Sequence, residues 1–236
     1  MPCANFRFYE ELNDFLAPAL RKREFNHACA DSATVKNAIE SLGVPHTEVE
    51  LILANGNSVA FSYLVQEGDL ISVYPQFESL DVTPLLKLRA KPLRVTRFIA
   101  DSHLGRLAKY LRMLGFDTLH EINYRDQEIA RIAATENRIV LTRDRALLMH
   151  KAITHGCYVH SLRAREQLLE LLARLDLYRS FKPFSRCLRC NGELACCDGL
   201  SAAFRQEWTC TQCDKLYWQG SHWRRMSAFI GELQRV

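Results

Sequence analysis

The sequence predicts an α/β protein built on a mainly parallel sheet, with a small α+β unit before it and a cysteine-bearing ribbon after it. Three observations lead to this prediction. Strand-like and helical runs alternate over residues 94–180, turn signals are closely spaced in residues 1–80, and two Cys-x-x-Cys pairs lie within residues 181–236. Residues 81–93, with Pro84 and Pro92 among basic positions, are interpreted as a linker.

The first 80 residues have the pattern of short strands around one helix. Helical spacing over residues 33–42 stops at Gly43, and the Asn55-Gly56 pair predicts a tight turn between two strands. Strands are expected around Phe6, Phe8 and Phe25 and over residues 49–54, 59–61 and 70–74.

Residues 94–180 alternate between the two kinds of apolar pattern. Strands are expected over 95–100, 116–119, 139–142 and 157–160, and helices over 104–114, 126–136, 146–155 and 164–175. This alternation predicts a parallel sheet covered by helices on both faces. Ligands of such sheets gather beyond the carboxyl ends of the strands.

Three aspartates occupy positions that lead to that edge. Asp101 and Asp144 each follow a predicted strand, and Asp126 opens a predicted helix. Taken singly, Asp126 and Asp144 are better explained as helix caps. Carboxylates that gather in one cleft repel each other unless a cation neutralises them, and Mg²⁺ or Mn²⁺ prefers such oxygen ligands. The three together predict a metal site for phosphodiester hydrolysis.

The charge distribution agrees with a polyanionic partner. Residues 1–80 contain 5 Lys/Arg and 11 Asp/Glu, whereas the rest of the chain contains 26 and 16. Arg106, Lys109 and Arg143 are the candidate phosphate contacts, and the alternative for them is a solvated basic surface. His103, beside Asp101, is either an acid–base group or an ordinary exposed histidine.

The strongest single motif is formed by four cysteines. Cys187 and Cys190 are separated by 19 residues from Cys210 and Cys213, a spacing typical of paired zinc knuckles. Four thiolates leave no position for water, so this zinc is expected to be structural. The adjacent Cys196 and Cys197 are the main rival ligands, and four unrelated reduced cysteines are the other alternative.

Aromatic and basic residues follow the second knuckle in "KLYWQGSHWRRM". Trp218, Trp223 and Arg224 are predicted to contact RNA, because rings can stack on unpaired bases while cations follow the backbone. The alternative is that these aromatics form the core of the ribbon. We expect at least one of the two tryptophans to lie in that core.

Several segments together resemble the Mut-seven C-terminal RNase domain family, a branch of the PIN-like nucleases. They are "RFIADSHLGRLAKYLRMLGFDTLH", "YRDQEIARIA", "NRIVLTRDRALL", "RCLRCNGEL" and "YWQGSHW". The resemblance implies a PIN-like parallel sheet with Asp101, Asp126 and Asp144 as the catalytic acids. Many PIN nucleases have a fourth acid, but "CYVHSLRAREQ" offers Ser161 and no acid before Glu166. Glu128 is a further candidate.

The run "VKNAIESLGVPHTEVELILANGNSVAFSYLVQEGDLISVYP" resembles the ubiquitin-like (β-grasp) domain that precedes certain bacterial RNase domains. Its sulfur-carrier relatives act through a free terminal Gly-Gly. Here the chain continues through Tyr74-Pro75, so carrier chemistry is not expected. Docking of a protein partner and simple stabilisation of the fused domain both remain open.

The leading interpretation is a cytoplasmic ribonuclease with structural zinc and catalytic Mg²⁺ or Mn²⁺. The N-terminus lacks a basic-then-apolar secretory pattern, and no uncharged apolar span is long enough to cross a membrane. Two alternatives stay open: a non-catalytic RNA-binding or adaptor protein, and a toxin-type nuclease with a narrow RNA target.

Overall fold

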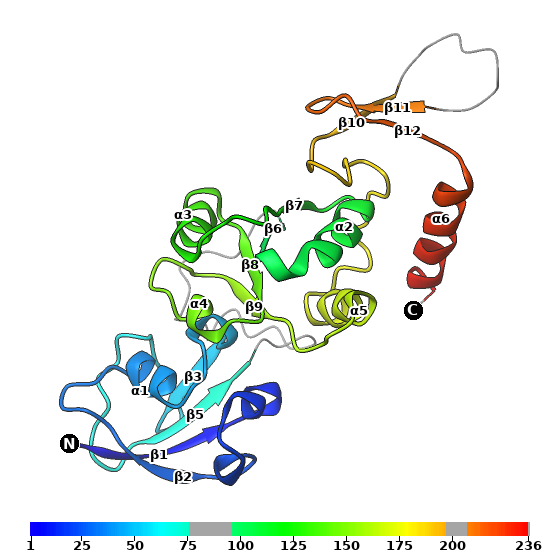
Figure 1. Ribbon diagram of the computed structural model, residues 1–236. Helices are drawn as coiled ribbons and strands as arrows, with labels where there is room; N and C mark the ends of the chain where they lie inside the picture. The colour runs from blue at the N-terminus through cyan, green and yellow to red at the C-terminus, as the bar shows by residue number, and fades with distance from the viewer. Residues whose placement is uncertain (76–95, 197–206, 236) are drawn as a thin grey trace.

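The computed structural model describes residues 1–75, 96–196 and 207–235, which form three units that follow one another along an elongated molecule (Figure 1). The predicted linker 81–93 and the start of the strand expected from residue 95 lie outside the described residues. None of the described helices combines the length and apolar character that crossing a bilayer requires.

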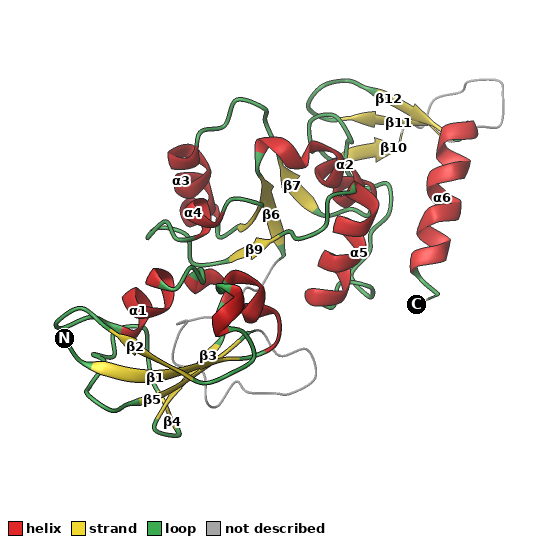
Figure 2. Ribbon diagram, turned by 60° about the horizontal axis from the view of Figure 1, so that its bottom comes forward, coloured by secondary structure: helices red, strands yellow, loops and turns green. Residues whose placement is uncertain are grey.

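The N-terminal unit is a mixed five-stranded sheet covered by one helix (Figure 2). Its elements are β1 (Cys3–Phe8), β2 (Phe25–Ala28), α1 (Val35–Ser41), β3 (Leu51–Ala54), β4 (Asn57–Ser58) and β5 (Leu70–Tyr74). The strand order is β2-β1-β5-β3-β4, and only the central β1–β5 pair is parallel. Val35 and Ile39 of α1 pack with Phe6 and Phe8 of β1 in one buried cluster. This is the predicted ubiquitin-like arrangement.

One strand prediction in this unit is wrong. Residues 59–61 do not form a strand, and β3 pairs instead with the two-residue β4 directly after the Asn55-Gly56 turn. The segment that follows binds the start of α1, since the N–H groups of Val35 and Lys36 donate to the carbonyls of Tyr63 and Phe61 at 2.7 and 3.4 Å. Those carbonyls satisfy helix donors rather than a neighbouring strand.

The central unit confirms the predicted parallel sheet with helices on both faces. Its elements are β6 (Arg97–Ala100), α2 (Gly105–Met113), β7 (Asp117–Leu119), α3 (Asp126–Glu136), β8 (Ile139–Thr142), α4 (Arg145–Leu148), β9 (Gly156–Tyr158) and α5 (Ala164–Arg174). The strands run parallel in the order β7-β6-β8-β9. Phe98 and Leu141 face the cluster that contains residues of α2 and α5, whereas Ile99 and Val140 face α3 and α4.

Helix α4 is shorter than the sequence predicts. It ends at Leu148, whereas helical spacing indicated residues 146–155. The chain turns at His150, whose Nδ1 accepts the N–H of Ala152 at 3.2 Å. Gly156 then permits a close approach, because a Cβ atom there would lie 2.5 Å from Leu148 Cδ2. The apolar residues after Leu148 therefore line a turn that returns the chain to the sheet.

The C-terminal unit is a three-stranded antiparallel ribbon followed by a long helix. β10 (Leu194–Cys196), β11 (Glu207–Cys210) and β12 (Leu216–Trp218) pair in that order, and α6 (Ser221–Leu233) follows. Helix α6 was not among the helices expected from the sequence. Its Ile230 and Leu233 join the buried cluster of the central unit, so the helix packs back onto that unit.

Candidate functional site

The carboxyl ends of β6 and β8 bring two of the predicted aspartates to one rim. Asp101 follows β6 directly, and its backbone N–H donates to the carbonyl of Leu141 on β8 at 2.9 Å. The Asp101 carboxylate accepts hydrogen bonds from the Ser102 N–H at 2.6 Å and the Thr142 hydroxyl at 2.8 Å. Thr142 Oγ1 in turn accepts the Asp144 N–H at 3.0 Å. One buried threonine therefore fixes the two aspartates relative to each other.

Asp144 combines this position with a capping role. Its Oδ1 accepts the N–H of Ala146 at 2.7 Å, so it is the N-cap of α4, as the alternative interpretation proposed. A carboxylate offers about four lone-pair sites, and one backbone donor leaves capacity for a further ligand. The capping role and a metal-binding role are thus compatible for this exposed residue.

The third predicted acid, Asp126, shares no described hydrogen bond with Asp101 or Asp144. It is the first residue of α3 and is exposed, while Arg125 occupies the N-cap, so the interpretation of Asp126 as the cap is wrong. Glu128 is exposed in the same first turn. Over the described ranges, the cysteines are the only set of three or more potential ligands whose atoms all lie within 4.8 Å of one another. The structure thus links Asp101 to Asp144 through Thr142, whereas Asp126 lies on α3 with no described contact to either of them.

The candidate phosphate contacts are all exposed. Arg106 and Lys109 lie on α2, the helix that begins just after Asp101, and Arg143 lies between Thr142 and Asp144. Because positions i and i+3 share a helix face, Arg106 and Lys109 project on the same side of α2. His103 is also exposed, one turn before α2.

An acid beyond β9 does exist, but it is engaged by the backbone. Glu170 of α5 accepts the N–H groups of His160 and Ser161 at 2.8 and 2.9 Å. Glu166, the first acid after Ser161 in sequence, is exposed and lies 3.5 Å from Arg163. Glu170 therefore anchors the chain after β9 to α5. No local sequence pattern indicates this role, because the contact spans nine to ten residues.

The N-terminal unit reaches the residue next to Asp144. The Arg145 guanidinium donates to the carbonyls of Phe15 and Asp14 at 3.0 and 3.4 Å and lies 5.0 Å from the centroid of the Phe15 ring. Contacts with the ubiquitin-like unit therefore help to position the first residue of α4 and its N-cap, Asp144.

The four predicted cysteines form a compact cluster. The sulfur atoms of Cys187 and Cys213 are 3.7 Å apart, and those of Cys190 and Cys210 are 3.3 Å apart. Tetrahedral bonds of about 2.3 Å would separate thiolates by about 3.8 Å, so the spacing fits one zinc ion. The rival ligand Cys196 is exposed at the end of β10 and is not in the cluster, and Cys197 lies outside the described residues.

Tyr217 supports the cluster from β12. Its hydroxyl accepts the N–H of Leu188 at 3.0 Å and lies 3.1 Å from Cys187 Sγ. Burial acts to raise the pKa of Cys187, but hydrogen bonds from Tyr217 and from backbone N–H groups outweigh it and lower this pKa to about 6. Cys187 is therefore a thiolate, the form that binds metal, at neutral pH, whereas burial and hydrogen bonds with the neighbouring thiols raise the pKa of Cys190 to about 12.

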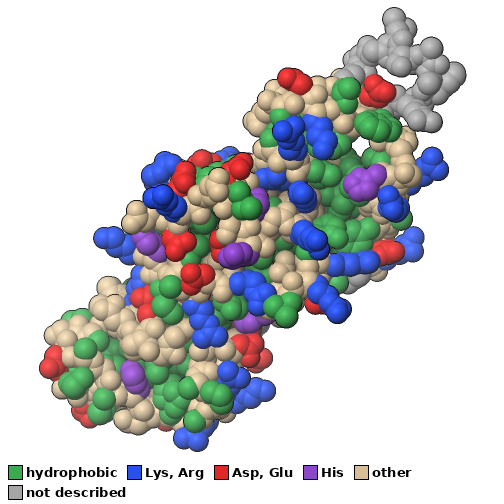
Figure 3. Space-filling view, in the orientation of Figure 1, with side chains coloured by type: hydrophobic (Ala, Val, Ile, Leu, Met, Phe, Trp, Pro, Cys, Tyr) green, Lys and Arg blue, Asp and Glu red, His purple; other side chains and the backbone are tan. Residues whose placement is uncertain are grey.

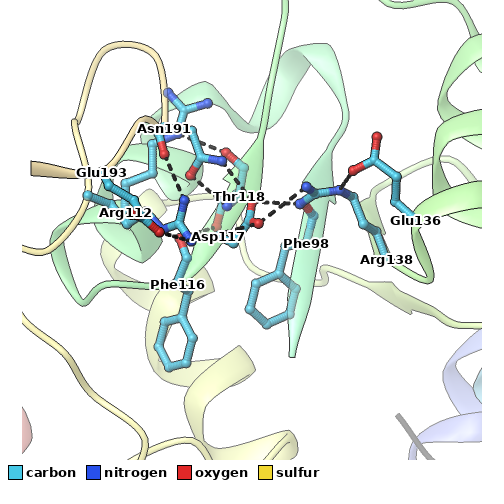
Figure 4. A network of polar contacts seen from close by, with 10 residues as sticks. Phe98, Arg112, Phe116, Asp117, Thr118, Glu136, Arg138, Asn191 and Glu193 are labelled. Carbon is cyan, nitrogen blue, oxygen red and sulfur yellow. Dashed lines mark hydrogen bonds and ion pairs between the residues drawn. The ribbon is translucent and has the colours of Figure 1, made fainter. Parts of the chain in front are cut away.

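A buried polar network joins the knuckle to the edge strand β7 (Figure 4). The Asn191 side chain accepts the Thr118 N–H at 2.8 Å and donates to Asp117 at 2.7 Å. Arg112 of α2 donates to the carbonyls of Leu188 and Arg189 at 3.2 and 2.9 Å. Arg112 is thus a buried structural residue, although it belongs to the basic segment of the sequence.

Asp117 is the charged centre of this network. Arg138 donates to its two carboxylate oxygens at 2.7 and 3.3 Å. Burial acts to raise the pKa of Asp117, but the hydrogen bonds from Arg138 and Asn191 outweigh it and hold this pKa below its usual value. The ribbon is therefore attached through an ionised carboxylate.

The two candidate tryptophans differ in their surroundings. Trp223 of α6 is half-buried, with its ring centroid 5.6 Å from that of Phe184, whereas Trp218 of β12 is 56% exposed. Arg224 is exposed on α6. The expectation that one tryptophan packs inside agrees with Trp223, and Trp218 is the ring that solvent can reach.

Two family models match the chain. The Mut7-C RNAse domain matches residues 96–230 and the Mut7-C ubiquitin domain matches residues 1–81. No curated protein matches. Two crystal structures of small archaeal modifier protein 1 from Haloferax volcanii are similar to 33% of this chain, with 17% and 16% identity, a TM-score of 0.27 each, and 100% and 99% of their own chains covered.

The first match covers more than half of the chain and includes both the aspartate rim and the cysteine cluster. The chain belongs to the Mut7-C RNAse domain family and carries that family's ubiquitin domain at its N-terminus. The central unit is therefore a nuclease domain of the PIN-like kind, and the cysteine cluster beside it is able to bind zinc.

Proposed function

We propose that this protein is a divalent-metal-dependent ribonuclease whose reaction takes place at the rim formed by Asp101 and Asp144, with Asp126 as the third acid. The observation that carries the proposal is the link through Thr142, which binds the Asp101 carboxylate and the Asp144 backbone N–H at the ends of adjacent parallel strands. Ligand chemistry in open parallel sheets gathers at this edge. The family of the central domain agrees with hydrolysis of RNA.

The residues at the rim fit a hard cation. Each carboxylate is oriented by backbone or hydroxyl donors, and each keeps lone pairs for a further ligand. Mg²⁺ or Mn²⁺ bound there would activate a water molecule and stabilise the leaving oxygen of a phosphodiester. Arg106, Lys109 and Arg143 would hold the phosphate backbone next to this rim, since all three side chains are exposed.

We also propose that the cysteine cluster holds a structural zinc ion. Its four sulfurs would complete a closed tetrahedral site, so the zinc would bind no water and would take no part in hydrolysis. The aspartates and the cysteines would therefore serve two different metals with two different tasks.

The test uses the full chain and single-stranded RNA with Mg²⁺ or Mn²⁺. Asp101→Asn and Asp144→Asn are expected to lower cleavage at least about a hundredfold, because a neutral amide is a poor ligand for these cations. Asp176→Asn, at an exposed residue after α5, is the matched control and should cleave as the unaltered chain does. Cleavage that survives both rim substitutions contradicts the assignment. Tight, salt-dependent RNA binding without cleavage under either metal would favour the adaptor alternative.

A further inference from the structure

A cavity of about 270 Å³ lies between the ribbon and α6. Its walls come from β11, β12, the start of α6 and the segment before the first knuckle, and Trp208, Trp218 and Trp223 are among the lining residues. Figure 3 shows hydrophobic side chains gathered between the ribbon and the C-terminal helix, with Lys, Arg and His side chains around them. Neither the aspartate rim nor the zinc cluster accounts for this cavity.

The walls of the cavity contain one tryptophan ring that is packed against the protein and one that is exposed to solvent. Trp223 is braced by Phe184, whereas Trp218 remains 56% exposed. The Trp218 indole lies against the start of α6, since a Cβ atom on Gly220 would come within 3.0 Å of Trp218 Nε1. An exposed ring held in a fixed position is suited to stacking on a planar ligand.

The charges around the cavity favour an anionic ligand. Among the described residues, the lining includes Lys215 and His222 and no Asp or Glu, and its third cation, Arg186, is already paired with two carboxylates at 3.9 and 3.8 Å. Arg224 and Arg225 are exposed in the next turn of α6. An apolar peptide would gain little from these cations, whereas a nucleotide combines a planar base with a charged phosphate.

The start of α6 adds a place for that phosphate. This helix of 13 residues has Gly220 as its N-cap, which provides no side chain to cap the first-turn N–H groups. Gly220, Ser221 and His222 all line the cavity. Uncapped backbone N–H groups at a helix N-terminus attract phosphate.

We infer that this cavity binds an unpaired nucleotide of the RNA substrate, with the base stacked on Trp218 and the adjoining phosphate at the start of α6. The site rests on the proposed ribonuclease function but is separate from the aspartate rim. The buried network around Asn191 and Arg112 attaches the ribbon to β7 and α2, next to the strand that leads to Asp101. A nucleotide bound in the cavity would thus be held at a fixed distance from the aspartate rim.

The test measures binding without cleavage. The Asp101→Asn chain, isolated with its zinc and without added Mg²⁺ or Mn²⁺, is titrated against a 5′-labelled uridine oligomer of about ten nucleotides and followed by fluorescence anisotropy. Adding Trp218→Ala is expected to weaken binding on the order of tenfold, and Trp218→Phe should restore most of it. Leu162→Ala removes another exposed apolar side chain, 76% exposed on the central unit, and should leave the affinity unchanged.

A second measurement leaves the cavity residues intact. An oligomer that contains 5-bromouridine is cross-linked by light to the Asp101→Asn chain, and the attachment points are mapped by mass spectrometry. Cross-links at Trp218 or His222 support the inference even if Trp218→Ala has lost its zinc. Cross-links confined to the central unit, or equal affinities of Trp218→Ala and its parent, overturn it.

The two proposals fail separately. If the unaltered chain never cleaves RNA but Trp218 still determines the affinity, the cavity is established and the ribonuclease assignment falls. If the chain cleaves RNA and Trp218→Ala binds as its parent does, the ribonuclease stands and the cavity inference is wrong.

Discussion

The carboxylate of Glu48, which has no exposed side-chain surface, forms an ion pair with Arg174 at the end of α5. It also accepts the backbone N–H of Tyr158 in β9 at 2.6 Å. A buried acid of the ubiquitin-like unit thereby binds two elements of the nuclease unit. His46 adds a third contact, since its Nε2 donates to the carbonyl of Ile153 at 2.9 Å. These contacts favour stabilisation of the fused domain as the role of the N-terminal unit.

Replacing Glu48 by Gln should destabilise the full chain by about 3 kcal/mol, because it removes the charge that contacts the largely buried Arg174 directly and leaves only the Glu11 carboxylate at 3.9 Å. Urea unfolding followed by circular dichroism measures this change. The control is Glu232→Gln, which breaks the exposed pair of Glu232 with Arg165 and should cost at most about 1 kcal/mol. Equal effects of the two substitutions would show that the buried contact does not join the units.

Thr142→Val tests the link between the two aspartates. Valine keeps the volume of the side chain but removes the hydroxyl that binds the Asp101 carboxylate and the Asp144 N–H. We expect kcat for RNA cleavage to fall about 10- to 100-fold with little change in KM, because the rim loses orientation rather than substrate contacts. Thr142→Ser keeps the hydroxyl and should stay within a few fold of the unaltered chain.

The alternation of strands and helices was predictable because short apolar stretches, most clearly those of β6 and β8, stand between helices with periodic apolar positions. The cysteine cluster was predictable from spacing alone. Helix α6 was missed for a physical reason. Its aromatic and basic first turns have the composition of a binding tail, and the residues that pack against the core, among them Ile230 and Leu233, begin only at Met226.

The contacts of the rim were only partly predictable. Asp101 and Asp144 follow strands, so their meeting follows from parallel topology, whereas the bridging role of Thr142 depends on side-chain rotamers. The position of Asp126 depends on the loop between β7 and α3, whose geometry no periodic pattern sets. Arg112 shows the same limit, since its burial arises from the knuckle carbonyls of Leu188 and Arg189, far along the chain.

The network at Asp117 predicts acid-sensitive attachment of the ribbon. In the folded chain the pKa of the Asp117 carboxyl is lowered. The stabilisation that the ionised carboxylate contributes is therefore complete above the unfolded-state pKa of about 3.9, and it is lost as the pH falls through the folded-state pKa. Urea unfolding between pH 7 and pH 3 should therefore show a smaller loss of stability in Asp117→Asn than in the unaltered chain. Asp176→Asn, at an exposed position, should retain the full acid dependence. Parallel pH curves for all three chains would contradict this role of Asp117.

Loss of zinc should destabilise the ribbon but leave metal binding at the aspartate rim intact. Cys213→Ser removes one of the four sulfurs and is expected to abolish stoichiometric zinc, measured by atomic emission, and to lower the melting temperature, because metal binding contributes to folding. Cys196→Ser, at the exposed cysteine outside the cluster, should retain one zinc per chain. RNA affinity should fall with the zinc, since the cavity wall at β12 depends on the ribbon, while Mn²⁺ binding at the aspartate rim should persist in the folded fraction. Unchanged stability and RNA affinity after complete zinc loss would show that the cluster neither folds the ribbon nor supports the cavity.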